Sequence, residues 1–311
     1  MAIHHVVVNS ALAVGVALTL VTGAGAAGAE ETAGAQCGGW TASPVSSGFG
    51  VLENLAFDGH GGLLLSELSV SGGAGALRRL HPDGSREVLA QVGAPGGIVV
   101  AGDTAYFVDS GAVSSGLAGR ADGTIDALDL TERTVSPVAT GLTTPNGLAR
   151  LPDGSFVVSR DLGSPTTLTR VAADGSGAHP FLPELTSTNG LAYDANRRKL
   201  FVSTTFDPTT TLAAIDVAQP DAAPARITIP GYGPLNSADD LTVGPDGDVY
   251  LALNVAGRVV RVDPDTGRSC VVADGIPFVT SARFGAGPGW DSRSVYVTSF
   301  LGTVTRLTPS A

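Results

Sequence analysis

A repeated pattern of short strands constrains the fold of this 311-residue chain more than any other feature. Each copy opens on a polar or small residue, continues as an apolar strand, turns through Asp and Gly, and returns as a second strand. The copies open at Glu53, Gly96, Asn146, Asn189, Asp239 and Thr280. Their spacing of roughly 40 to 50 residues is typical of β-propeller blades.

The turns and the remaining strands support the same interpretation. Pro152-Asp153-Gly154 and Pro245-Asp246-Gly247 supply residues that tolerate positive φ, which tight hairpins need. The sequence therefore predicts an all-β fold, a six-bladed β-propeller with about four antiparallel strands per blade. The last copy is one strand short. We expect the segment 40–48 to supply that strand and close the ring from the N-terminal side.

The first 29 residues are typical of a signal peptide. Ala11 to Val21 is apolar and uncharged, and Ala27-Gly28-Ala29 provides small residues for cleavage near Ala29. An uncleaved membrane anchor is the alternative, but the apolar run is short for a span of about 20 residues. We therefore expect a secreted protein, not bound to the membrane after cleavage, in which residues 30–311 form a single propeller domain.

The chain has two cysteines, Cys37 and Cys270. In an oxidising compartment they are the one available pair, which favours a disulfide between the closing strand and a neighbouring blade. Two unpaired thiols are the alternative. No second cysteine or nearby histidine completes a zinc-binding pattern around either one.

Charge and motif content exclude several functions. The formal net charge of −11 argues against nucleic-acid binding, which needs a basic surface. A Gly-x-Ser-x-Gly motif and a phosphate-binding glycine motif are both missing from the sequence. Beyond the predicted signal peptide the histidines are His60, His81 and His179, which do not favour a catalytic triad. We expect a monomer that acts on a small molecule.

The opening positions of the repeat carry the chemistry. Residues at one repeat position lie at one height around a propeller axis, so Glu53, Asn146, Asn189 and Asp239 should meet at one mouth of the channel. Two carboxylates and two amide oxygens suit Ca²⁺, with Mg²⁺ or Zn²⁺ as alternatives. The competing interpretation is that the two Asn-Gly pairs only shape turns and that the two acids are solvated strand ends.

These phased residues resemble the senescence marker protein (regucalcin)/gluconolactonase family of six-bladed propellers. The resemblance also rests on the segments 145–148, 188–191, 257–264 and 280–285, and it extends over roughly residues 48 to 308. It implies that Glu53, Asn146, Asn189 and Asp239 bind a divalent cation. It also implies hydrolysis of a lactone, as in many members of the family.

The chain departs from the family pattern at three points. Asn54-Leu55 follows the first Glu in place of Gly-Pro, and Asp240 follows Asp239 in place of Gly. Thr144 stands where the sugar-lactonase members place an Arg that holds the substrate. These departures leave the metal ligands intact and argue against a sugar lactone as the substrate.

The resulting hypothesis is a secreted, metal-dependent hydrolase of a lactone or related ester, in which Asp239 both binds the cation and acts as general base. Glu67, Asp109 and Arg160, at the ends of second strands, are candidate pocket residues, with solvated loop positions as the alternative. The competing functions are a non-catalytic binding propeller with a structural calcium and a propeller with phosphotriesterase or strictosidine synthase-like chemistry.

Overall fold

The computed structural model describes residues 34–68, 74–111, 118–163 and 165–310. These residues all belong to one compact unit, Ala33–Ala311. The predicted signal peptide, residues 1–29, lies outside the described residues. Within the described ranges no helix has the length and hydropathy of a membrane-spanning segment.

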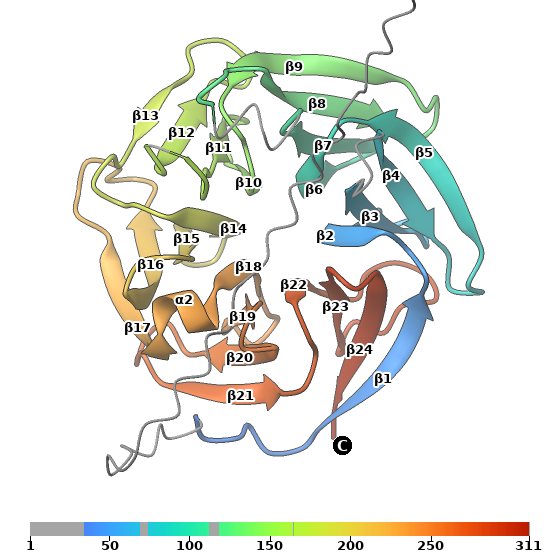
Figure 1. Ribbon diagram of the computed structural model, residues 1–311, viewed down its shortest axis with the longest axis vertical. Helices are drawn as coiled ribbons and strands as arrows, with labels where there is room; N and C mark the ends of the chain where they lie inside the picture. The colour runs from blue at the N-terminus through green and yellow to red at the C-terminus, as the bar shows by residue number, and fades with distance from the viewer. Residues whose placement is uncertain (1–33, 69–73, 112–117, 164, 311) are drawn as a thin grey trace, which may run out of the picture. The chain divides into compact units, whose positions relative to one another are not determined.

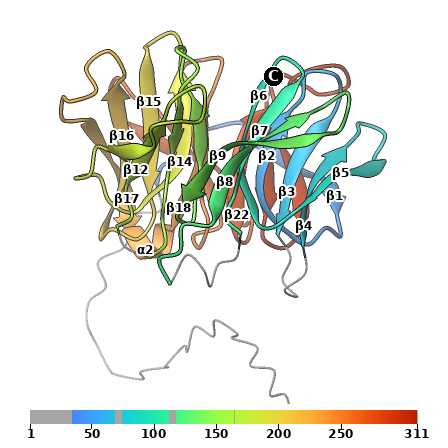
Figure 2. The same ribbon diagram turned by 90° about the horizontal axis from the view of Figure 1, so that it is seen from above.

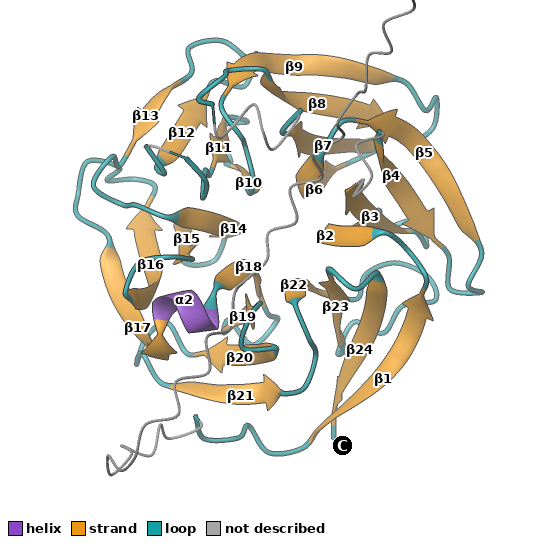
Figure 3. Cartoon of the chain, in the orientation of Figure 1, coloured by secondary structure: helices purple, strands orange, loops and turns teal. Residues whose placement is uncertain are grey.

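Six four-stranded antiparallel sheets surround a central axis and form the predicted six-bladed propeller (Figure 1). Figure 3 shows that the described chain is almost entirely strand and loop, with one short helix, α2 (Gly233–Asn236). The first three blades comprise β2 (Val51–Phe57), β3 (Leu63–Leu68), β4 (Gly75–Leu80) and β5 (Arg86–Val92); β6 (Pro95–Ala101), β7 (Thr104–Asp109), β8 (Gly123–Asp129) and β9 (Val135–Leu142); and β10 (Leu148–Arg150), β11 (Phe156–Val158), β12 (Leu168–Val171) and β13 (His179–Phe181).

The remaining three blades follow the same order from the axis outward. They comprise β14 (Thr188–Asp194), β15 (Lys199–Thr204), β16 (Thr209–Asp216) and β17 (Ala225–Tyr232); β18 (Ala238–Val243), β19 (Val249–Leu253), β20 (Arg258–Val262) and β21 (Ser269–Ala273); and β22 (Val279–Phe284), β23 (Val295–Ser299), β24 (Thr303–Pro309) and β1 (Trp40–Ser47).

Alternation within the middle strands builds the core between blades. In β19, Leu251 and Leu253 pack into the cluster shared with the fourth blade, whereas Tyr250 and Ala252 pack into the cluster shared with the sixth. Because successive side chains of a strand point to opposite faces, a sheet buried on both faces needs an unbroken apolar run. This requirement explains why Val249 to Leu253 contains no charged residue.

The ring closes as the sequence predicts. β1 pairs antiparallel with β24, from Trp40 opposite Pro309 to Ser47 opposite Thr303, and becomes the outer strand of the sixth blade. Just before β1, Cys37 forms a disulfide with Cys270 on β21 of the fifth blade. This bond closes a loop of more than two hundred residues, for which the chain-entropy model gives up to about 5 kcal/mol of stabilisation.

Candidate metal centre and active site

In five of the six blades the first strand has a register shift near its start, and β10 of the third blade has none. In β2, Leu52 pairs with Glu67 and Asn54 pairs with Ser66, so Glu53 has no partner on β3. The same kind of register shift falls between Thr188 and Leu191 in β14 and between Ala238 and Leu241 in β18. A β-bulge releases a residue from the ladder and re-aims its side chain. The bulges thus free Glu53, Asn189 and Asp239 from regular pairing.

Glycines beside these positions allow neighbouring blades to approach closely. A Cβ at Gly147 would lie 2.4 Å from the Asn189 carbonyl oxygen, and one at Gly190 would lie 2.5 Å from the Asp240 Cα. Neither glycine has a positive φ. The interpretation of the two Asn-Gly pairs as hairpin turns is therefore wrong, because each glycine serves close packing between inner strands.

Hydroxyl side chains satisfy the backbone groups that the bulges leave unpaired. Ser203 Oγ accepts a hydrogen bond from Gly190 N at 2.8 Å and donates one to the Asp239 carbonyl at 2.6 Å. Ser66 Oγ donates to the carbonyl of Gly96 in the next blade at 2.5 Å. Each serine therefore links the second strand of one blade to the first strand of the next, at the level of the candidate ligands.

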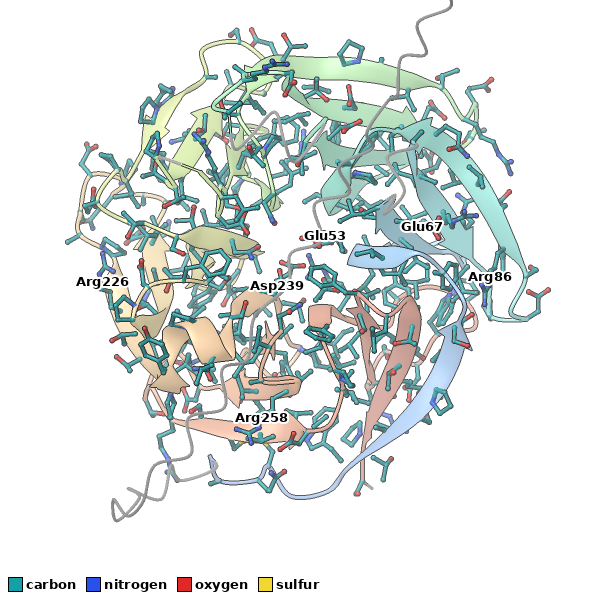
Figure 4. The ribbon with its side chains drawn as sticks, in the orientation of Figure 1. Glu53, Glu67, Arg86, Arg226, Asp239 and Arg258 are labelled. Atoms are coloured by element: carbon teal, nitrogen blue, oxygen red, sulfur yellow. A yellow bond between two sulfur atoms is a disulfide. The ribbon has the colours of Figure 1, made fainter. Side chains whose placement is uncertain are left out.

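Two of the four predicted ligands, Asn146 and Glu53, contact each other, and the other two have polar partners within their own blades. Asn146 Nδ2 lies 3.4 Å from Glu53 Oε1, although 93 residues separate them in the sequence. Asn254 Nδ2 donates to Asp239 Oδ2 at 3.3 Å, and Asn189 Nδ2 donates to Thr205 Oγ1 at 3.0 Å. Figure 4 shows Glu53 and Asp239 beside the central opening, on the first and fifth blades.

The acids of this site strongly disfavour their ionised forms. Burial, together with the negative charges of Asp161 and Asp240, raises the pKa of Glu53 to about 8. Burial also raises the pKa of Asp239 well above its usual range, with added repulsion from Glu53, Asp240 and Asp161. A group of buried carboxylates that repel one another is the electrostatic environment that a bound divalent cation would relieve.

Asp161 is a site residue that the repeat pattern did not identify. It follows β11 in the third blade, and burial raises its pKa to about 6, while a hydrogen bond from Asn146 opposes that shift. Its Oδ1 is buried and has no hydrogen-bond partner among the described residues. No repeat phase marks this position, because it lies in the loop after a second strand. Its one sequence signal is its place beside Arg160.

Asn54 and Asp240, two residues that depart from the family pattern, contact each other. Asn54 Nδ2 donates to Asp240 Oδ2 at 2.7 Å, and Ser281 Oγ donates to the same oxygen at 2.6 Å. Arg283 Nη1 lies 2.8 Å from it and forms a buried ion pair. Asp240 is thus held by three donors from two other blades, which distinguishes it from Asp239. The side chains at 54 and 240 form one polar pair that replaces the two glycines of the family pattern.

The predicted pocket residues lie outside this cluster. Glu67 forms an ion pair with Arg78 on the neighbouring strand, and Figure 4 shows it farther from the axis than Glu53. Asp109 accepts hydrogen bonds from the backbone of Gly93 at 2.7 Å and of Ala94 at 2.8 Å. Their carboxylates therefore organise local backbone and strand pairing, and a role in substrate binding stays a prediction.

Arg160 has a different environment. Its Nε donates to the Leu162 carbonyl at 2.9 Å, and its side chain lines a cavity of about 240 Å³ together with Pro145 and His179. Burial lowers the pKa of its guanidinium, and the charge of Asp161 opposes that shift. Arg160 is therefore next to the acidic cluster in the sequence, but its role in a pocket also stays a prediction.

The four predicted ligands suit a cation only if the amide oxygens of Asn146 and Asn189 bind it together with the two carboxylates. Among the described residues, no three His, Cys, Asp or Glu side chains are grouped so as to hold a metal. Asn189 Oδ1 is buried without a hydrogen-bond partner in the described part of the chain. A buried amide oxygen without a partner is a suitable donor for a hard cation such as Ca²⁺, which accepts mixed oxygen ligands.

The sequence matches the family model described as SMP-30/Gluconolactonase/LRE-like region over residues 74–300. The chain belongs to this family. The match covers five of the six inner strands, and Glu53 lies upstream of it. A search of curated protein sequences finds no match.

Solved structures share the fold of this family member. A gluconolactonase from Xanthomonas campestris has 17% identity and a TM-score of 0.68, with 88% of this chain and 91% of that chain covered. A luciferin-regenerating enzyme has 15% identity and a TM-score of 0.63, covering 87% and 95%. An aldose sugar dehydrogenase from Streptomyces coelicolor has 16% identity and a TM-score of 0.63, covering 86% and 98%. At these identities the likeness concerns the fold.

Proposed function

We propose that this protein is a secreted, metal-dependent hydrolase of a lactone or related ester, with Glu53, Asn146, Asn189 and Asp239 holding a divalent cation, most suitably Ca²⁺. The observations that carry the proposal are the contact of Asn146 with Glu53, the repulsion between buried Glu53 and Asp239, and the partnerless amide oxygen of Asn189. The family membership and the fold of a gluconolactonase support the reaction class.

A bound divalent cation would polarise the substrate carbonyl and stabilise the negative charge that develops on its oxygen. Asp239 is positioned to bind the cation through one carboxylate oxygen while Asn254 holds the other at 3.3 Å. We assign Asp239 the role of general base toward water, because a carboxylate that binds the cation would also lie next to a water bound there.

Turnover of a small panel of lactones and esters, with and without a chelator, tests this function. We expect hydrolysis of at least one lactone, loss of that activity in chelator, and recovery when Ca²⁺ is added back. Cation-dependent melting without any turnover would instead favour the binding propeller. Hydrolysis of a phosphotriester in place of every lactone would favour the phosphotriesterase alternative.

Asp161→Asn tests the assignment of the base. Removal of one negative charge beside Glu53 should weaken Ca²⁺ binding about tenfold, equivalent to about 1.4 kcal/mol, since a nearby opposite charge favours the bound cation. At saturating Ca²⁺ we expect kcat to stay within about tenfold of the wild type. Titration calorimetry and steady-state kinetics measure the two effects. A thousandfold loss of kcat at saturating Ca²⁺ would transfer the base role to Asp161.

A further inference from the structure

Exposed apolar side chains gather on one face of the ring. Of the eight large hydrophobic residues that are exposed in the described chain, six lie at or between strand ends in three consecutive blades, with 46% to 59% of their surface accessible. These six, here called the apolar rim, are Phe206, Tyr232, Leu235, Val255, Phe278 and Leu301. Large apolar side chains scattered singly need no explanation, but a group on one face marks a binding surface.

Strand direction places the rim on the same face as the candidate ligands. In antiparallel blades the first strand starts, and the second and fourth strands end, at one face of the ring. Phe206, Val255 and Leu301 follow the second strands β15, β19 and β23. Tyr232 ends β17, and Leu235 belongs to α2, which Figure 2 shows at the edge of one face. Phe278 precedes the inner strand β22.

The rim is continuous with the site through backbone neighbours. Thr205, which accepts the hydrogen bond of Asn189, directly precedes Phe206. Asn254, which donates to Asp239, directly precedes Val255. The helix that carries Leu235 ends in a left-handed Ser237, two residues before Asp239. Phe206 and Val255 therefore directly follow residues whose side chains contact predicted ligands.

The charge of the site restricts what the rim can bind. Four carboxylates, on Glu53, Asp161, Asp239 and Asp240, repel one another at this mouth. Arg283 is paired to Asp240, and Thr144 stands at the arginine position of the sugar-lactonase members, so neither position offers a free guanidinium to an anion or a sugar.

We infer that the substrate is a lactone or ester with an apolar chain, whose reacting carbonyl meets the cation site while the chain lies on the rim over the fourth to sixth blades. This inference rests on the proposed function, since it assigns a substrate class to the same site. The rim buries the chain from water, and each fully buried methylene should improve binding about fourfold.

The test compares γ-butyrolactone with γ-octalactone as substrates, and γ-butyrolactam with γ-octalactam as ligands that resist hydrolysis. The rim variant is the double change Leu235→Ser and Phe278→Ser. The matched control is Val88→Ser with Val135→Ser, which removes the two exposed valines of the outer strands β5 and β9. We expect wild-type kcat/KM to favour the octalactone at least about tenfold. The rim variant should reduce that ratio at least about fivefold, and the control should keep it.

The outcomes separate this inference from the proposed function. An equal or inverse chain-length preference in the wild type overturns the inference, as does an unchanged ratio in the rim variant. If no lactone is hydrolysed, calorimetry with the two lactams decides: tighter, rim-dependent binding of the octalactam supports the rim although the hydrolase proposal fails. Equal binding of the two lactams would overturn the inference. Co-sedimentation of the protein with phosphatidylcholine vesicles, without any chain-length preference among substrates or lactams, would overturn it too.

Discussion

Asp239→Asn should abolish both turnover and the stabilisation of the fold by Ca²⁺. The change keeps the size of the side chain but removes one of the two ligand charges and the proposed base. We expect kcat/KM to fall by at least about 10³-fold, the scale of general acid–base and metal contributions. The addition of Ca²⁺ should no longer raise the melting temperature. Kinetics and differential scanning calorimetry measure the two effects.

The same variant should stabilise the metal-free protein at pH 8. Asp239 is buried among Glu53, Asp240 and Asp161, and their repulsion disfavours its ionised form. An amide at this position removes that cost. Asp274→Asn is the matched control, because Asp274 pairs with Arg258 at an exposed position on the periphery. Full activity of Asp239→Asn, or an equal loss in the control, would remove Asp239 from the mechanism.

The metal-free protein should lose stability as pH rises from about 4.5 to about 8. Glu53 has an unfolded pKa of 4.5 and a folded pKa of about 8, so within this window the folded state holds a proton that the unfolded state has released. Stability therefore falls with rising pH, by on the order of 5 kcal/mol at most for Glu53 alone. Asp161 adds to the loss below its folded pKa of about 6.

Calorimetry in a chelator between pH 5 and pH 8 measures this loss as a fall in melting temperature on the order of 10 °C. Ca²⁺ should restore more stability at pH 8 than at pH 5, because it competes with the proton for the same carboxylates. Glu53→Gln removes the titrating group and should flatten the slope. Surface acids with lowered pKa values, such as Asp153 and Asp263, titrate below this window. A melting temperature that is constant in chelator would contradict the electrostatics described for the site.

The sequence was sufficient to predict the blades and the closure of the ring. Repeats of strand and Asp-Gly turn are local signals, and they gave six blades because each blade is one local unit. The last copy lacks an outer strand, which predicts that an N-terminal strand closes the ring. The presence of two cysteines predicts the disulfide. Gly154 and Gly247 have φ values of 84° and 85°, as the predicted hairpin turns require.

The details of the site were harder to predict, because they depend on contacts between blades. The bulge at Glu53 arises from pairing with β3 and has no local sequence mark. The contact of Asn54 with Asp240 joins residues 186 positions apart, so their shared role as a polar pair is visible only in the fold. Asp161 lies in the loop after β11, outside the repeat phase, so the repeat pattern does not mark it. The proposed ligand set remains a prediction until a cation is measured.

The closure of the ring has a consequence for how the molecule is made. The sixth sheet takes one strand from residues 40–47 and three from Val279 onward, so its outer edge stays open until Thr303 to Pro309 have been synthesised. The first five blades can form in order as the chain emerges, but the sixth blade cannot form until both β1 and β24 are present. Final assembly is therefore a late step of high contact order, and a chain interrupted before its last strand would retain an open, association-prone edge.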